Sequence, residues 1–236
     1  MLRNGVPDPI VALWYWANIG SWAQLLVAIN VRVEVVGREN VPRSGPLILA
    51  CNHISVADPP IITVKTPRRI AWMAKKELFD VPVIGLAYYL YGCLPVRRFE
   101  ADLQALRRAR QALRRGMALG MFPEGTRSGR PGMNRAYPGT ALIALQTGAP
   151  VLPVGIMGTE AIRLPRSFFN WARGERPLVR LVYGRPFSLP RLERVRTPQV
   201  EEATQEIMRR IAELLDPPYR GVYARLCEME SANDAR

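Results

Sequence analysis

The chain alternates short apolar runs with longer segments whose apolar positions recur every three to four residues. Short apolar runs are typical of buried strands, and the longer segments are typical of helices that turn one face toward a core. Strands are expected at 32–36, 47–51, 69–74, 93–96, 118–122, 151–157 and 178–184, and helices at 80–92, 101–116, 139–148 and 198–215. This order predicts an α/β fold with a mostly parallel central sheet flanked by helices.

The N-terminal segment differs from the rest, because no charged residue occurs from Pro9 to Val31. The run is long enough for a membrane-spanning helix, but polar residues interrupt it. Its aromatic residues, Trp14, Tyr15, Trp16 and Trp22, are of the kind that lies at the headgroup level of a bilayer. A spanning helix, an interfacial or bent helix pair and a buried core helix all remain open, and the polar interruptions favour the interfacial form. A secretory signal peptide fits poorly.

These patterns divide the chain into three parts. Residues 1–30 are expected to be an apolar, membrane-associating helical segment, residues 31–220 a single α/β domain, and residues 221–236 a C-terminal tail. A core of this size fits one domain and leaves little room for a second.

The charge balance indicates the class of partner. The chain has 33 Lys and Arg against 20 Asp and Glu, a formal net charge of +13 at pH 7, which favours nucleic acid, a membrane surface or phosphorylated small molecules. Almost all of the cations are arginines, whose guanidinium groups bind phosphate in a bidentate manner. Nucleic acid is not expected, because the arginines form no recognisable binding motif and the aromatic residues are concentrated in the N-terminal run.

The helix expected at 101–116 shows two faces. An apolar stripe consists of Leu103, Leu106, Leu113 and Met117, and the opposite face carries Arg107, Arg108, Arg114 and Arg115. The arginine face is consistent with exposure to solvent and equally with contact to anionic lipid headgroups.

Catalytic chemistry has few candidate residues in this chain. His53 is the only histidine, and the three cysteines have no metal-ligand spacing, so no metal site and no disulfide framework are predicted. A G-x-S-x-G motif, typical of serine hydrolases, does not occur.

His53 and Asp58 form the first candidate pair. Five positions apart on one helix they would point about 140° away from each other, so they can meet only if the chain turns between them. A strand that ends at Cys51 and a helix that begins at Asp58, followed by two prolines, would supply that turn. A histidine oriented by a carboxylate is suited to act as a general base near neutral pH.

Two further polar segments follow expected strands. "MFPEGTRSGR" contains Glu124, Gly125, Thr126 and Arg127, and "GCLPVRR" ends with Arg97 and Arg98. Glycine-containing turns and arginines suit anions, and Glu124 could pair with an arginine or bind a substrate hydroxyl. Since the carboxyl ends of parallel strands meet at one edge of a sheet, the three segments are expected to form one site.

The same residues resemble the lysophospholipid acyltransferase family, in particular the bacterial 1-acyl-sn-glycerol-3-phosphate acyltransferases. The resemblance rests on four ordered blocks between about residues 31 and 184. They are an NHxxxxD block (Asn52, His53, Asp58), a G-x-x-P-V-x-R block (Gly92, Pro95, Val96, Arg98), an FPEGTRS block (Phe122 to Ser128) and an apolar strand "VLPVGI" with Pro153.

The resemblance implies a glycerolipid acyltransferase-like fold for residues 31–220 and transfer of an acyl group from acyl-CoA or acyl-ACP to the sn-2 hydroxyl of lysophosphatidic acid. It implies His53 as the base, Asp58 as its orienting partner, and backbone groups near Gly125 as oxyanion donors. Arg98 and Arg127 would hold the phosphate, and Glu124 and Thr126 would position the substrate. Asn52, Ser55, Arg97 and Ser128 are secondary candidates.

The implied setting is phospholipid biosynthesis at the cytoplasmic face of the cell membrane. The expected partners are lysophosphatidic acid, anionic membrane lipids and, where the donor is acyl-ACP, acyl carrier protein, with no bound cofactor. Residues 81–92 are a candidate for part of the wall of an acyl groove. An acyltransferase that acts on another lyso-lipid and a non-catalytic basic protein of the membrane surface remain as alternatives.

Overall fold

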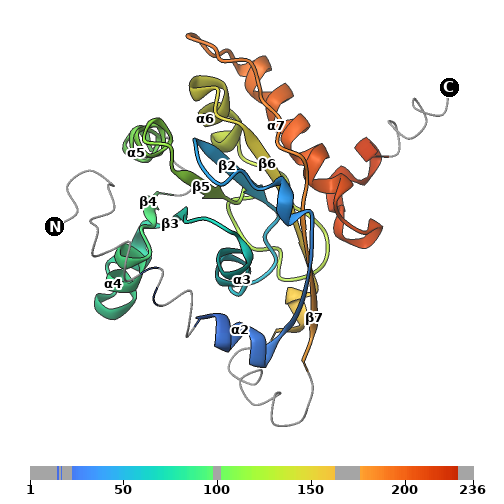
Figure 1. Ribbon diagram of the computed structural model, residues 1–236. Coiled ribbons are helices and arrows are strands. Elements are labelled where there is room, and N and C mark those ends of the chain that lie inside the picture. The colour runs from blue at the N-terminus through green and yellow to red at the C-terminus, as the bar shows by residue number, and fades with distance from the viewer. Residues whose placement is uncertain (1–14, 16, 18–22, 98–101, 163–175, 228–236) are drawn as a thin grey trace.

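The computed structural model describes residues 15, 17, 23–97, 102–162 and 176–227. These residues form an α/β fold in which a seven-stranded sheet has the order β1-β7-β6-β2-β5-β3-β4. Neighbouring strands are parallel except for β6 and β7, which are antiparallel. The expectation of a mostly parallel sheet flanked by helices is therefore confirmed (Figure 1).

The strands lie close to the positions expected from the apolar runs. They are β1 (Arg32–Val36), β2 (Leu47–Cys51), β3 (Ile70–Lys75), β4 (Leu94–Val96), β5 (Ala118–Met121), β6 (Val151–Met157) and β7 (Leu178–Tyr183). Every residue of β2, β5 and β6 is buried. Central strands covered on both faces have no polar face, which is why they read as continuous apolar runs. Exposed and covered residues alternate in β1 and β7, at one side of the sheet.

Helices cover both faces of the sheet. They are α2 (Gln24–Asn30), α3 (Asp58–Lys65), α4 (Pro82–Leu90), α5 (Leu103–Arg114), α6 (Gly139–Thr147) and α7 (Thr197–Glu213). Apolar residues of α5, α6 and α7 form one core cluster with alternate residues of the central strands, and residues of α2 and α3 form a second cluster with the others. The two clusters lie on opposite faces because successive side chains of a strand point to opposite sides.

The apolar stripe expected on α5 is wrong in part. The residues that α5 buries are Ala105, Ala109, Ala112 and Leu113, whereas Leu103 is 64% exposed and Leu106 is only partly buried. Small alanine side chains allow the helix to lie close to its neighbours, so the leucines at its N-terminal end remain at the surface. The four arginines of the opposite face are exposed, as expected.

The N-terminal segment is described only in part. Tyr15 is 1% exposed, and its hydroxyl accepts a hydrogen bond from the Ile70 N–H at 3.3 Å, so the expectation that this ring lies at headgroup level is wrong. Trp14, Trp16 and Trp22 lie outside the described residues. In the part of the chain that the structure describes, no helix has the length and apolar character needed to span a membrane. The boundaries at residues 30 and 220 stay a prediction.

Arg68 connects two loops at the amino-terminal edge of the parallel strands. Its guanidinium donates hydrogen bonds to the carbonyl oxygens of Pro42 (2.8 Å), Gly45 (2.7 Å) and Gly116 (3.0 Å). The side chain is buried, so these carbonyls depend on Arg68 for their hydrogen bonds.

We expect Arg68→Met to lower the free energy of unfolding by about 2–4 kcal/mol, because it removes three hydrogen bonds that a buried guanidinium donates to two loops. Urea unfolding would measure this difference. Arg43→Met is the matched control, because Arg43 is exposed, and it should change the free energy by less than about 0.5 kcal/mol. Equal effects of the two substitutions would contradict the structural role of Arg68.

Candidate active site

The turn between β2 and α3 brings His53 and Asp58 together. The His53 Nδ1 atom lies 2.8 Å from the Asp58 Oδ2 atom, and both side chains are buried. The same Oδ2 atom accepts hydrogen bonds from the backbone N–H groups of Ile54 (2.7 Å) and Ser55 (2.8 Å). Ala57 occupies the N-cap position of α3, so the Asp58 carboxylate does not cap this helix and instead fixes the preceding turn and the imidazole ring.

Asn52 attaches this turn to the neighbouring strand. Its side-chain amide donates to the Ile156 carbonyl at 2.9 Å and accepts from the Ile156 N–H at 2.8 Å. The amide thereby continues the hydrogen bonding between β2 and β6 beyond the end of β2. Because both polar ends of the side chain are occupied and the residue is buried, Asn52 positions His53 rather than facing a substrate.

Glu124 joins the His53 turn to the loop that follows β5. Its Oε1 atom accepts a hydrogen bond from the His53 N–H at 2.9 Å, and its Oε2 atom accepts one from the Asn134 N–H at 2.7 Å. The residue is 1% exposed. This is neither of the two roles considered from the sequence, because both oxygens are bound to backbone groups and neither is open to a substrate.

Backbone hydrogen bonds also connect the two loops directly. The Ser128 N–H donates to the His53 carbonyl at 2.9 Å, and the Gly129 N–H donates to the Ile54 carbonyl at 3.1 Å. The Ser128 hydroxyl donates to the Arg130 carbonyl. The FPEGTRS loop is therefore held along the His53 turn by the Glu124 side chain before its exposed residues and by main-chain hydrogen bonds after them.

Gly125 shapes the exposed tip of this loop. Its φ of 65° is left-handed, and a Cβ atom at this position would lie 2.9 Å from the Tyr137 ring. Its N–H donates to the Phe122 carbonyl at 3.0 Å, so this amide is already used in the turn. The next two amides, of Thr126 and Arg127, have no hydrogen-bond acceptor among the described residues, and both residues are exposed.

Phe122 forms an aromatic stack with the imidazole. The His53 and Phe122 ring centroids are 3.9 Å apart with an interplanar angle of 18°, and Trp72 stacks on Phe122 at 4.9 Å and 11°. The Trp72 ring nitrogen donates to the Thr63 hydroxyl at 2.8 Å, which ties the stack to α3. Phe122 and Trp72 were not among the candidate site residues, because their apolar side chains read as ordinary core in the sequence.

His53 lines a cavity of about 590 Å³ that lies between α3, β3 and α4. Its walls include the apolar residues Ile70, Trp72, Ala87 and Tyr91, and Lys75 and Arg127 contribute the cations. Residues of the segment 81–92 do line this cavity, as the acyl-groove interpretation requires, although they supply only one side of it. We call this the His53 cavity.

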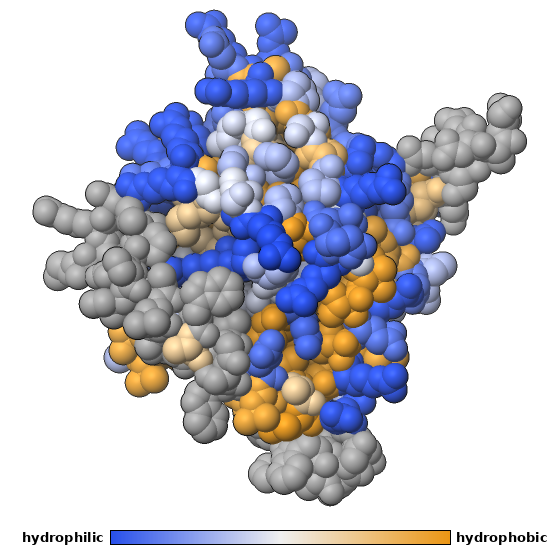
Figure 2. Space-filling model, viewed as in Figure 1, coloured by the Kyte–Doolittle hydropathy of each residue, from blue (hydrophilic) through white to orange (hydrophobic). Residues whose placement is uncertain are grey.

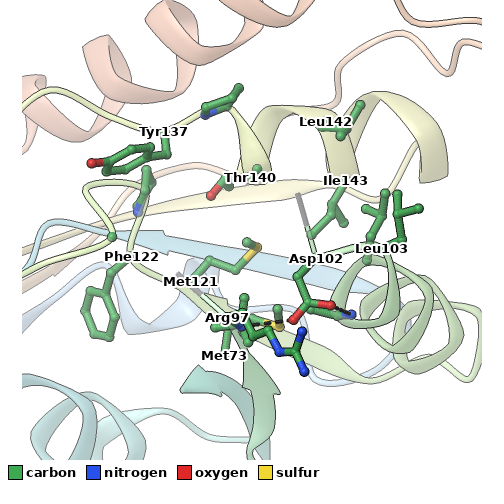
Figure 3. A pocket seen from close by; sticks show the side chains of 17 residues that line it. Met73, Arg97, Asp102, Leu103, Met121, Phe122, Tyr137, Thr140, Leu142 and Ile143 are labelled. Atoms are coloured by element: carbon green, nitrogen blue, oxygen red, sulfur yellow. Dashed lines mark hydrogen bonds between the residues drawn. The ribbon is translucent and has the colours of Figure 1, made fainter. Parts of the chain in front are cut away.

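A second cavity, of about 500 Å³, lies between α5 and α6 (Figure 3). Arg97 lies at this cavity and not at the first one. Its backbone N–H donates a hydrogen bond to the Asp102 Oδ2 atom at 2.9 Å. Met73 and Phe122 line both cavities. We call this the α5–α6 cavity. Arg98, the second arginine of the GCLPVRR segment, lies outside the described residues.

Metal ligands are not grouped in this region. Within the described ranges, no cluster of three or more His, Cys, Asp or Glu side chains could hold a metal ion. The chemistry that this arrangement can perform with its own groups is removal of a proton by the His53 ring, beside two apolar cavities and several cations.

Burial raises the pKa of Glu124 from the ordinary glutamate value of 4.5 to about 7, and the nearby Asp58 charge acts in the same direction, although the two backbone donors oppose it. Since the pKa is higher in the folded state, the stabilisation from Glu124 is complete below about pH 4.5. It is lost as the pH rises through about 7.

We therefore expect the wild type to lose roughly 2–3 kcal/mol in free energy of unfolding, relative to Glu124→Gln, as the pH rises from about 5 to above 7. Urea unfolding at a series of pH values would measure it. Glu193→Gln, at an exposed position, is the control and should give no such change. Parallel curves for wild type and Glu124→Gln would disprove the shift.

Comparison with known proteins identifies related sequences. The 1-acyl-sn-glycerol-3-phosphate acyltransferase BAT2 of Brassica napus is 32% identical over 145 residues, 60% of this chain and 42% of that protein. A 1-acyl-sn-glycerol-3-phosphate acyltransferase from Borreliella burgdorferi is 31% identical over 144 residues, 60% of this chain and 57% of that protein. The matches thus span about half the length of these curated relatives.

The crystal structure of PlsC, a 1-acyl-sn-glycerophosphate acyltransferase from Thermotoga maritima, superimposes with a TM-score of 0.58 at 23% identity. It covers 94% of this chain and 95% of that one, and thus shares the fold. The family model named Acyltransferase matches residues 32–157, which is more than half of the chain and includes His53, Asp58 and the FPEGTRS loop. The chain therefore belongs to the acyltransferase family.

Proposed function

We propose that this protein transfers an acyl group from a thioester donor, acyl-CoA or acyl-ACP, to the sn-2 hydroxyl of 1-acyl-glycerol-3-phosphate, and so produces phosphatidic acid. The observation that carries the proposal is the 2.8 Å contact between His53 Nδ1 and Asp58 Oδ2, in a ring that lines an apolar cavity with Lys75 and Arg127. The names of the curated relatives support the choice of acceptor.

In this mechanism the Nε2 atom of His53 removes the proton from the acceptor hydroxyl. The alkoxide attacks the thioester carbonyl, and the tetrahedral intermediate collapses with release of the thiolate, which takes the proton back from the imidazolium. Asp58 holds the neutral ring in the required tautomer and stabilises the imidazolium. No acyl-enzyme is formed, and the protein itself supplies the proton transfer.

The oxyanion of the intermediate needs hydrogen-bond donors that are not already used. We assign this role to the backbone N–H groups of Thr126 and Arg127 in place of the Gly125 N–H, which the Phe122 carbonyl occupies. A well-placed donor of this kind contributes about 3 kcal/mol in comparable acyl-transfer sites. Arg127 and Arg97 would also bind the acceptor phosphate, while Glu124 and Asn52 fix the loops.

Acyl transfer from labelled acyl-CoA and acyl-ACP to a panel of lyso-lipids tests this proposal. We expect His53→Ala to lower the rate by about 10²- to 10⁴-fold, and Asp58→Asn to lower it by a comparable factor because it leaves the wrong tautomer. Circular dichroism would confirm that the variants fold. Undiminished transfer by His53→Ala would rule out the mechanism, since the chain has no other histidine. Preference for a different lyso-lipid would reject the proposed acceptor.

The acceptor resides in a membrane, and we propose that the protein binds the cytoplasmic face of the cell membrane through its N-terminal apolar segment. The described end of this segment supports contact with a bilayer, because Leu25 and Leu26 of α2 are 53% and 45% exposed. Figure 2 shows apolar side chains gathered around α2 at the lower part of the molecule, bordered by hydrophilic ones. The net charge of +13 favours anionic lipids.

Replacement of Leu25 and Leu26 by serine should weaken partitioning to anionic vesicles by roughly tenfold, since two apolar side chains leave the interface. Vesicle sedimentation would measure the bound fraction. The matched control replaces Val36 and Val222, which are 46% and 59% exposed elsewhere on the molecule. Equal partitioning of the two double variants would contradict the contact.

A further inference from the structure

Apart from Arg97, the residues that line the α5–α6 cavity have no role in the mechanism above, although the cavity borders the FPEGTRS loop. Gly125 and Pro123 of the FPEGTRS loop line it, together with Phe122, which also stacks on His53. Phe122 and Met73 line both cavities. The α5–α6 cavity is therefore a largely apolar space that adjoins the His53 cavity at Phe122 and Met73.

The lining of this cavity suits a hydrocarbon chain. Figure 3 shows Leu103, Leu142 and Ile143 on one side and Met73 and Met121 on another, with Arg97 and Asp102 between them. Both carboxylate oxygens of Asp102 already accept hydrogen bonds within the protein. Oδ2 accepts one from the Arg97 backbone N–H and Oδ1 accepts one from the Ala105 backbone N–H, both at 2.9 Å. The Arg97 side chain is exposed and has no ion-pair partner among the described residues.

Acyl transfer from a thioester to a lyso-lipid requires room for two chains. The position of Arg97 distinguishes the cavity of the acceptor chain from that of the donor chain. In a lyso-lipid phosphate, the phosphate, the free hydroxyl and the chain are attached to adjacent carbons of one glycerol. An exposed cation in the lining of the chain cavity, such as Arg97, fits that molecule. In an acyl-CoA or acyl-ACP the phosphates are separated from the thioester by the pantetheine arm, so they would lie far from both cavities.

We propose that the α5–α6 cavity binds the alkyl chain of the lyso-lipid phosphate acceptor, with its phosphate at Arg97, while the donor chain occupies the His53 cavity on the other side of Phe122. This inference rests on the proposed function for its assignment of acceptor and donor. It identifies Leu103, Leu142 and Ile143 as residues that select the acceptor chain. These residues are distinct from those of the His53 cavity, which face the donor chain.

The experiment measures binding of 1-acyl-glycerol-3-phosphate with short and long chains by calorimetry, below their micellar concentrations. In the wild type each added methylene should tighten binding up to roughly fourfold while the chain still fits. Gly139→Leu places a side chain at the cavity, where a Cβ atom meets nothing within 4 Å and φ is not left-handed. It should abolish this chain-length dependence and change the Kd of the short-chain lipid by less than about twofold.

Ala87→Leu, in the wall of the His53 cavity, is the matched control and should leave the dependence on acceptor chain length intact. Should Gly139→Leu fail to fold, Leu103→Trp narrows the same cavity from a residue that is 64% exposed. Transfer assays with donors of varied chain length are run in parallel, and in Gly139→Leu their profile should match that of the wild type.

Three results would overturn the inference: a chain-length dependence that survives in Gly139→Leu, a changed donor profile in that variant, or no binding of the lyso-lipid phosphate to the wild type. Failure of the proposed function gives a different pattern. The wild type could transfer no acyl group and still bind longer acceptor chains more tightly, with Gly139→Leu abolishing that dependence. This result would support the cavity assignment and reject the proposed reaction.

Discussion

The site depends on one oxygen atom, the Oδ2 of Asp58, which accepts hydrogen bonds from the His53 ring and from the Ile54 and Ser55 N–H groups. The carboxylate is fully buried, and a buried charge is tolerated only when hydrogen bonds replace its lost hydration. Because the three donors belong to the turn that carries the histidine, the contacts that stabilise the carboxylate also fix the position of the imidazole. Structural and chemical requirements coincide at this atom.

Glu124 extends the same principle to the second loop. A buried carboxylate that accepts backbone N–H groups from two segments connects them more rigidly than an arginine pair at the surface would, since neither partner can move to another rotamer. Asn52 provides the third connection, to β6. The buried side chains of Glu124 and Asn52 therefore hold the His53 turn against the neighbouring loop and strand.

Much of the fold could be predicted from the sequence, and the reasons for success and failure are physical. The fully buried strands β2 and β6 were found at their observed bounds because apolar runs bordered by turn residues have few other interpretations. The buried stripe of α5 was misassigned because alanine carries little hydrophobic signal, although its small size lets helices approach closely. Tyr15 was misplaced because an amphipathic ring suits a core with one hydrogen bond as well as a lipid interface.

The contacts of the candidate site were also predictable only in part. The spacing of His53 and Asp58 and the turn between them were sufficient to predict their contact. The bridging role of Glu124 could not be predicted, because its partners are backbone groups of residues 53 and 134, and backbone donors have no signature in a sequence. Sequence also gave no reason to separate Arg97 from Arg127, which line different cavities.

The stacked ring of Phe122 between the two cavities has a kinetic consequence. A ring packed between an imidazole and an indole cannot swing aside without breaking both contacts, so it stays in place where the two cavities adjoin. Two substrates whose chains lie on opposite sides of it would enter and leave without passing each other. Under the proposed assignment of the two chains, the occupancy of one cavity would leave the other open, and the two substrates would be able to bind in either order.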